Sequence, residues 1–410
     1  MPALPLGQEA YQRTYANEPE IQMLNRFFET NPTNTTDQKA LLARPGSAVL
    51  TNTGGTGLAR GFFSTADLFK GDLFFVQGGS MYRYRPDGTL IPIGGTVYGT
   101  GKASFAFNVG PSYARLFVAD GTLLQYYEGG SKGTATLTAT AAITNQVIQI
   151  GATYYTWNAS VAGAATGAAA FPWISKIGVD TATSIQNMAN TINFVGTRGV
   201  DFSPNLGGQS SDVVATNTAT TLILTSKSDL AAANTLATAV TGPAGLAWSA
   251  ATIVGAGTHV LKGVAMPDGK GAQAICPLSS YVLVALANSG RFYWIQPGAT
   301  IINGLDFASA ESQPDNIIDM ISTGDTAWIL SGNSTEVWYA TGNIANPFAP
   351  TQGRAYSRGI IPGTSVRVKD QVVAVGSDSI VYAIGRGVQR ISHHGIEERI
   401  RTQLKRESGT

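Results

Sequence analysis

The segment at residues 99–104, "GTGKAS", is the part of the sequence that most resembles a phosphate-binding loop. That loop needs a glycine five residues before the second glycine and Ser or Thr directly after the lysine. Here Thr96 and Ala103 occupy those two positions. The flanking residues also predict strands, so no helix N-terminus would meet the phosphate oxygens. We therefore interpret residues 99–104 as a surface hairpin and expect no nucleotide site.

The histidines and the cysteine lack the spacing of a metal or nucleophile site. Adjacent residues on a strand face opposite ways, so we expect His393 and His394 to make a poor chelating pair. His259 and Cys276 are far from that pair in sequence. A zinc site or a Cys–His nucleophile is therefore not supported, and we predict that the chain has no metal site.

Two "DGT" triplets, at 87–89 and 120–122, could belong to a calcium or carbohydrate site, but Asp-Gly is also a favoured hairpin turn. Glycosidase chemistry needs two carboxylates that converge on one pocket. The only dense acidic cluster comprises Glu311, Asp315, Asp319 and Asp325. We interpret these four as turn residues.

We interpret the recurring aromatics as core residues: Tyr82, Tyr84, Tyr126, Tyr127, Trp294, Trp328 and Trp338. The sequence thus predicts no catalytic residue, no cofactor and no enzyme.

The composition predicts a strand-rich chain with few charges. Among 410 residues, 13% are charged, compared with roughly 25% in ordinary soluble proteins. The 48 glycines indicate many turns and short strands. A net charge of +1 gives no whole-chain electrostatic case for binding nucleic acid. We expect no secretory signal at the N-terminus and no membrane insertion, because no apolar run approaches ~18 residues.

An internal repeat provides the elements that would position these residues. Five stretches share an apolar strand, a tight turn and a second strand with an aromatic, and they start at Gly71, Ala114, Ser280, Asp325 and Asp370. Most starts lie about 43 to 45 residues apart, as in propeller blades of ~40–50 residues. The fold class we predict is mainly β: a β-propeller of about five to six blades, with a small α+β domain inserted.

The one long interval contains the insertion. Residues 131–258 are rich in Ala, Thr and Gly, and residues 181–193 place Ile185, Met188 and Ile192 at helical spacing, with Thr183 as the expected N-cap. We therefore divide the chain into an N-terminal arm with the first blades (1–130), the inserted domain (131–258), and the remaining blades with a C-terminal helical tail (259–410). Either the N-terminal segment completes the ring, or the propeller is incomplete in this chain.

Several motifs in sequence order resemble those of the packaged-DNA stabilisation proteins, the tail hub or nozzle subunits of short-tailed bacteriophages. They are "MLNRFFETNP" (23–32), "ALLARPGSAVL" (40–50), "ARGFF" (59–63), "AESQPDNI" (310–317), "RGIIPGTSV" (358–366) and "RISHHGIEE" (390–398). The resemblance covers about 1–130 and 260–400 and leaves the insert out.

The resemblance implies a virion structural protein of the phage tail, assembled in the host cytoplasm. Its expected partners are five further copies in a hexameric tube, the portal and adaptor ring proteins, a tailspike or fibre, a plug or needle, and transiently the double-stranded DNA in the channel. A near-neutral chain suits a conduit, because phosphate contacts from Lys or Arg would impede sliding. A histidine ring around a sixfold axis could bind an ion. The alternative function is a carbohydrate-binding or glycan-degrading propeller.

Two groups of residues are candidate structural or contact sites. Pro314 restricts the backbone before it, and Glu311, Ser312 and Asp315 can hydrogen-bond backbone groups, so we expect a rigid crossover between blades. Ile396, Ile400 and Leu404 predict a short amphipathic C-terminal helix. Its basic residues are Arg399, Arg401, Lys405 and Arg406, candidate contacts to a neighbouring subunit or to DNA.

Overall fold

The computed structural model describes residues 26–30, 39–43, 52–111 and 113–408. The chain divides into two compact units. One comprises residues 1–128 with 261–410, and the other comprises residues 129–260. Residues 1–25 of the predicted N-terminal arm, and most of the "MLNRFFETNP" and "ALLARPGSAVL" motifs, lie outside the described residues.

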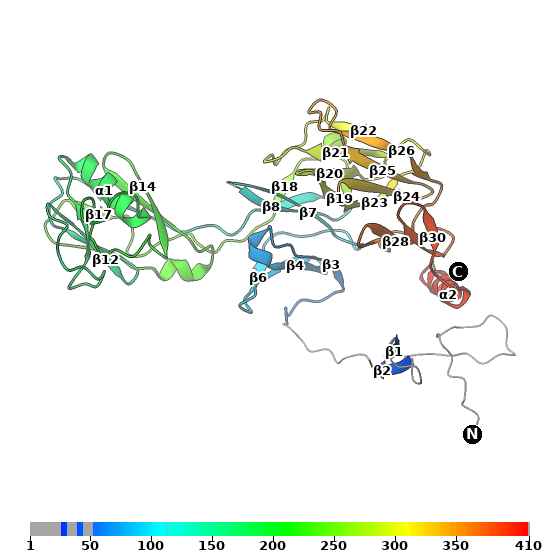
Figure 1. Cartoon of the computed structure of the whole chain (residues 1–410), viewed down its shortest axis with the longest axis horizontal. Coiled ribbons are helices and arrows are strands. Elements are labelled where there is room, and N and C mark those ends of the chain that lie inside the picture. The colour runs from blue at the N-terminus through cyan, green and yellow to red at the C-terminus, as the bar shows by residue number, and fades with distance from the viewer. Residues whose placement is uncertain (1–25, 31–38, 44–51, 112, 409–410) are drawn as a thin grey trace, which may run out of the picture. The chain divides into compact units, whose positions relative to one another are not determined.

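The first unit contains five antiparallel four-stranded sheets, each a propeller blade (Figure 1). Blade 1 comprises β3 (Ala59–Phe63), β4 (Leu73–Gln77), β5 (Ser80–Tyr84) and β6 (Leu90–Ile93). Blade 2 comprises β7 (Ser104–Gly110), β8 (Tyr113–Ala119), β9 (Leu124–Tyr127) and β18 (Lys262–Val264). Blade 3 comprises β19 (Ala272–Leu278), β20 (Tyr281–Leu286), β21 (Arg291–Ile295) and β22 (Phe307–Ser309). Blade 4 comprises β23 (Ile317–Thr323), β24 (Thr326–Ser331), β25 (Thr335–Ala340) and β26 (Phe348–Tyr356). Blade 5 comprises β27 (Val366–Val368), β28 (Gln371–Val375), β29 (Val381–Ile384) and β30 (Val388–Arg390).

The five repeats found in the sequence are the second and third strands of the five blades. They carry the signal because strands two and three are joined by a tight turn and are apolar on both faces. The "DGT" triplets are hairpin turns: Asp87 Oδ1 accepts from Thr89 N at 2.9 Å, and Asp120 Oδ1 accepts from Thr122 N at 2.8 Å. The prediction of a mainly β propeller is confirmed.

Neighbouring blades are held together by four hydrophobic clusters. One cluster joins each pair of consecutive blades, from blades 1 and 2 to blades 4 and 5. Five of the seven aromatics expected in the core are buried: Tyr82, Tyr127, Trp294, Trp328 and Trp338. Tyr84 and Tyr126 are partly exposed. The blades therefore stack through their faces.

The second unit packs two four-stranded sheets and one helix around its own core. One sheet comprises β14 (Val213–Asn217), β15 (Thr221–Ser226), β10 (Thr134–Ala139) and β17 (Leu246–Trp248). The other comprises β13 (Trp173–Lys176), β12 (Thr153–Asn158), β11 (Val147–Ile150) and β16 (Thr238–Thr241). The helix α1 (Thr181–Asn193) covers the predicted residues and buries Ile185, Met188 and Ile192. The predicted N-cap is wrong: Asp180 caps the helix, because its Oδ1 accepts from Thr183 N at 2.7 Å.

The remaining elements are a short hairpin and a terminal helix. The hairpin pairs β1 (Arg26–Thr30) with β2 (Lys39–Ala43). The helix α2 spans His394–Ser408. His394 begins this helix and His393 precedes it. The sequence interpretation placed the histidine pair on a strand, and that placement is wrong. Three 3-10 turns complete the description: Phe69–Gly71, Ala231–Thr235 and Pro267–Gly269.

Candidate functional site

The propeller has a central cavity of about 520 Å³ that is open to solvent. Its lining comes from the innermost strand of every blade, namely β3, β7, β19, β23 and β27, or from residues beside them. In a propeller these first strands surround the axis, so the cavity is the one place where all five blades meet. We take it as the candidate site.

A charged group from blade 2 crosses the cavity to blades 4 and 5. Lys102, two residues before β7, places its Nζ 2.6 Å from Asp319 Oδ2 on β23. The same Nζ donates to the carbonyl oxygen and to Oγ of Ser365, at 3.2 and 3.3 Å. Ser365 Oγ in turn donates to Asp319 Oδ2. We call Lys102, Asp319 and Ser365 the central clasp.

The clasp changes the interpretation of two sequence motifs. Residues 99–103 lie in the crossover from β6 of blade 1 to β7 of blade 2, and residue 104 begins β7, so the prediction of a surface hairpin is wrong. The structure has strand β7 and no helix directly after this segment. Asp319 lies within β23 and is buried, so its interpretation as a turn residue is also wrong. A buried carboxylate needs a partner, and Lys102 provides it.

Arg60 holds the crossover that carries Lys102. Its Nη1 donates to the carbonyls of Gly78, Val97 and Tyr98 at 2.7 to 3.0 Å, and its Nε donates to Gly101 O at 2.8 Å. Gly99, which lies between Tyr98 and Gly101 in the sequence, adopts φ +45°, and a Cβ there would lie 2.2 Å from Asp120 O. Only glycine fits this position without a backbone shift.

Cys276 lines the cavity as an inert thiol. Burial raises its pKa far above the ordinary value, and the charge of Asp319 raises it further. The thiol therefore stays protonated at neutral pH, and a thiolate is the form that attacks substrates.

The described lining of the cavity contains a single carboxylate. Asp319 is the one carboxylate among the described residues of its lining, and Lys102 neutralises it. Glycosidases use two carboxylates on either side of the scissile bond.

Within the described part of the chain, no three His, Cys, Asp or Glu side chains are grouped so that they could hold a metal ion. No helix there is long and apolar enough to cross a membrane.

The segment from Glu311 to Asp315 connects β22 of blade 3 to β23 of blade 4. Asp315 Oδ2 accepts from the backbone N–H groups of Asn333 and Ser334 at 2.6 and 3.0 Å. The buried carboxylate of Glu336 accepts from Ser312 N at 2.6 Å. Glu311 and Pro314 are exposed. Two of the four predicted residues, Ser312 and Asp315, thus contact the β24–β25 hairpin of the next blade.

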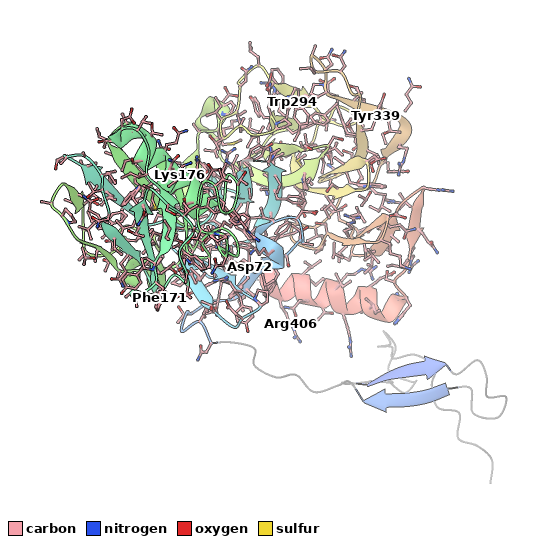
Figure 2. All side chains as sticks on the ribbon, turned by 60° about the vertical axis from the view of Figure 1, so that its left-hand side comes forward. Asp72, Phe171, Lys176, Trp294, Tyr339 and Arg406 are labelled. Atoms are coloured by element: carbon pink, nitrogen blue, oxygen red, sulfur yellow. The ribbon has the colours of Figure 1, made fainter. Side chains whose placement is uncertain are left out.

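The four basic candidates lie on α2, and Figure 2 shows Arg406 near the end of this helix. Arg399, Lys405 and Arg406 are exposed. Arg401 forms an ion pair with Glu398 at 3.3 Å. The structure therefore places these residues together on one helix and apart from the central cavity.

Residues 247–407 match a protein-family model described as "Bacteriophage P22 Gp10, beta-propeller". This match covers less than half of the chain and includes blades 3, 4 and 5. It supports a bacteriophage protein of that family with a structural role as a virion component. The motifs that we quoted from residues 1–130 lie outside the match and stay a resemblance. No curated protein matches the sequence.

Several solved structures are distantly similar. "Structure of Dos1 propeller" shares 13% identity at a TM-score of 0.29, covering 94% of this chain and 81% of that one. The Myceliophteria thermophila Cps50 (Swd1) β-propeller domain shares 10% identity at a TM-score of 0.32, covering 83% and 88%. "YCF48 bound to D1 peptide" shares 10% identity at 0.27, covering 80% and 79%. At these TM-scores the similarities carry no functional argument.

Sequence reasoning missed the clasp because its members are far apart in the chain. Lys102 and Asp319 are separated by 217 residues. The one available signal was a charged residue within an apolar inner strand, since an unpaired charge is rarely buried. Asp319, between Ile318 and Met320, has that pattern.

Proposed function

We propose that the chain is a tail hub or nozzle subunit of a short-tailed bacteriophage. Six copies form a tube below the portal and adaptor rings. The tube retains the packaged DNA, docks tailspikes or fibres, contacts a plug or needle, and provides the exit channel. The observation that carries this proposal is the match of residues 247–407 to a phage propeller family.

The central clasp constrains the path of DNA in this proposal. Lys102 and Asp319 meet at 2.6 Å across the propeller axis, so a duplex does not pass through the cavity of one subunit. The channel is therefore the space enclosed by several subunits. A net charge of +1 suits its wall, because each phosphate contact adds salt-dependent affinity.

Electron microscopy of the purified full-length chain, alone and with portal and adaptor rings, tests the proposal. We expect rings with sixfold symmetry that join the lower end of the adaptor. A particle that stays monomeric and binds neither ring would contradict it.

A glycan array run on the same preparation tests the alternative function, and specific glycan binding in the cavity would favour that alternative.

A further inference from the structure

A second cavity lies between blades 4 and 5, and we call it the boundary pocket. It measures about 500 Å³, is open to solvent and shares no lining residue with the central cavity. Blade 4 contributes the β23–β24 turn, Trp328 on β24 and Arg354 on β26. Blade 5 contributes the β27–β28 and β29–β30 turns. The wall of the boundary pocket therefore combines the turns of two neighbouring blades.

Arg354 is held in this wall by contacts to both blades. Its guanidinium carbon lies 4.9 Å from the centre of the Trp328 ring, which is buried. Its Nη2 donates to Gly385 O at 2.9 Å, and the Tyr356 hydroxyl donates to the same carbonyl at 3.3 Å. Arginine stacks readily on aromatic faces. The stacking and the hydrogen bond thus position the charged group before any ligand arrives.

Two guanidinium groups of the boundary pocket have unused donors. Arginine carries five N–H donors, and within the described residues the side chain of Arg354 uses only Nη2. Its buried Nε has no hydrogen-bond partner there, although most buried polar groups have one. Arg386 is exposed in the β29–β30 turn and forms no ion pair with a described residue. Paired guanidinium groups of this kind bind oxyanions.

The charges of the boundary pocket favour a single carboxylate over a phosphate chain. Asp370 is the one acidic residue in the described lining, so Arg354 and Arg386 leave one excess positive charge. A carboxylate neutralises that charge, and its two oxygens match the planar fork of a guanidinium group. A nucleic acid carries a negative charge at every phosphate, and its further phosphates would be repelled by Asp370.

We propose that the boundary pocket binds the side-chain carboxylate of an acidic residue on a partner protein. Arg354 provides the fixed donors, and Arg386 donates to the carboxylate from the exposed turn. The volume of the pocket falls in the range of sites that hold a drug-sized molecule. It therefore accommodates an acidic side chain together with the neighbouring backbone of a partner loop.

Protection of Arg386 from phenylglyoxal, an arginine-selective reagent, tests the proposal on the full-length protein. The probes are N-acetylglutamate methylamide, its neutral glutamine counterpart and a short DNA duplex. Mass spectrometry of the digested protein reports the modification of each arginine, and the exposed Arg406 serves as the internal control. We expect the glutamate probe to protect Arg386 saturably without protecting Arg406, and the glutamine probe to protect neither.

Two outcomes of this experiment would overturn the proposal. The first is modification of Arg386 at the same rate with and without the glutamate probe. The second is protection of Arg386 by the duplex at a phosphate concentration below that of the glutamate probe, which would indicate a nucleic-acid contact instead.

Substitutions in the lining give a second readout. Arg354→Gln should raise the concentration of the glutamate probe that half-protects Arg386 by about tenfold or more, because a hydrogen bond to a charged group is lost. Since Arg354 also packs on Trp328, an exposed position provides an independent test. Asp370→Asn removes the competing carboxylate and should lower the half-protecting concentration. Glu311→Gln, the matched control at an exposed acid outside the lining, should leave it unchanged; equal values for these two variants would contradict the site.

Discussion

At the scale of single residues, the central clasp explains why a chain with few charges keeps two of them near the propeller axis. The side chain of Asp319 is 4% exposed and that of Lys102 is 33% exposed. The cost of burying the carboxylate is offset by an ion pair and by the Ser365 hydroxyl. A buried pair contributes little net stability compared with apolar packing, but removing one partner is costly.

We therefore predict that Lys102→Met lowers the free energy of unfolding by about 2–3 kcal/mol. Loss of one partner of a fully buried pair costs ~3–5 kcal/mol, and partial exposure of Lys102 reduces this figure. Urea unfolding measures the change. The matched control is Lys270→Met at an exposed lysine, with an expected change within about 0.5 kcal/mol. If Lys102→Met combined with Asp319→Leu were no more stable than Lys102→Met alone, the account of the clasp would be wrong.

The two glycines of the 99–104 crossover should differ sharply in their tolerance of a side chain. Gly99 has φ +45° and its Cβ would meet Asp120 O, whereas a Cβ at Gly101 would meet nothing within 4 Å. We predict that Gly99→Ala lowers the free energy of unfolding by about 2 kcal/mol or more. Gly101→Ala should leave it nearly unchanged. Thermal or urea unfolding of the two variants side by side decides the point.

At the scale of elements, α2 is anchored to blade 5 by one buried carboxylate. Arg390 on β30 donates to both oxygens of Glu397 at 2.8 Å, and Ser392 Oγ donates to Oε1 at 2.7 Å. Burial alone would raise the pKa of Glu397. The hydrogen bonds from Ser392 and Arg390 outweigh it and hold the pKa below the ordinary value of 4.5. The helix is thus fixed at its N-terminal turn.

This anchor should weaken in acid. Because the folded pKa of Glu397 is lowered, its contribution is present above the unfolded pKa and is lost as pH falls through the folded value. We predict that the fluorescence anisotropy of a dye at Arg406→Cys decreases as pH falls below about 4.5. With Glu397→Gln the anisotropy should already be low at neutral pH. Glu398→Gln, the control on the adjacent residue, should keep the original profile; identical profiles for both variants would refute the anchor.

Sequence patterns predicted elements well where periodicity is local, and poorly where geometry depends on distant partners. The two middle strands of each blade and the helix at 181–193 carry their own turn signals and apolar periods. The inner strand β27 and the outer strands β22 and β30 have three residues each, too few to show a period. The N-cap of α1 was misplaced because Asp180 and Thr183 are both acceptable caps by residue type.

At the scale of the whole molecule, the inserted unit leaves and rejoins blade 2 within a single hairpin. β9 and β18 pair antiparallel, with Tyr126 opposite Lys262. Glu128 and Lys262, at the two ends of the excursion, form an ion pair. A hydrogen bond from Lys262 is the main cause that lowers the pKa of Glu128. Blade 2 is therefore a complete sheet whose third turn has been replaced by residues 129–260.

The propeller should consequently fold without its insert. We predict that replacing residues 129–260 with a short Asp-Gly turn changes the propeller's free energy of unfolding by less than about 1 kcal/mol, because closing a shorter loop costs less entropy. Near-UV circular dichroism from buried Trp328 and Trp338 monitors the fold. Aggregation or loss of that signal would show that the insert supports the blade.

The central clasp should also resist forces that pull the blades apart. Blades 2 and 5 are not neighbours in the ring, yet Lys102 and Ser365 connect them through a bond that runs across it. A pull that widens the ring must stretch this bond before it peels one blade from the next. Single-molecule stretching should therefore show a first rupture that disappears when the lysine is removed, well before the sheets unravel.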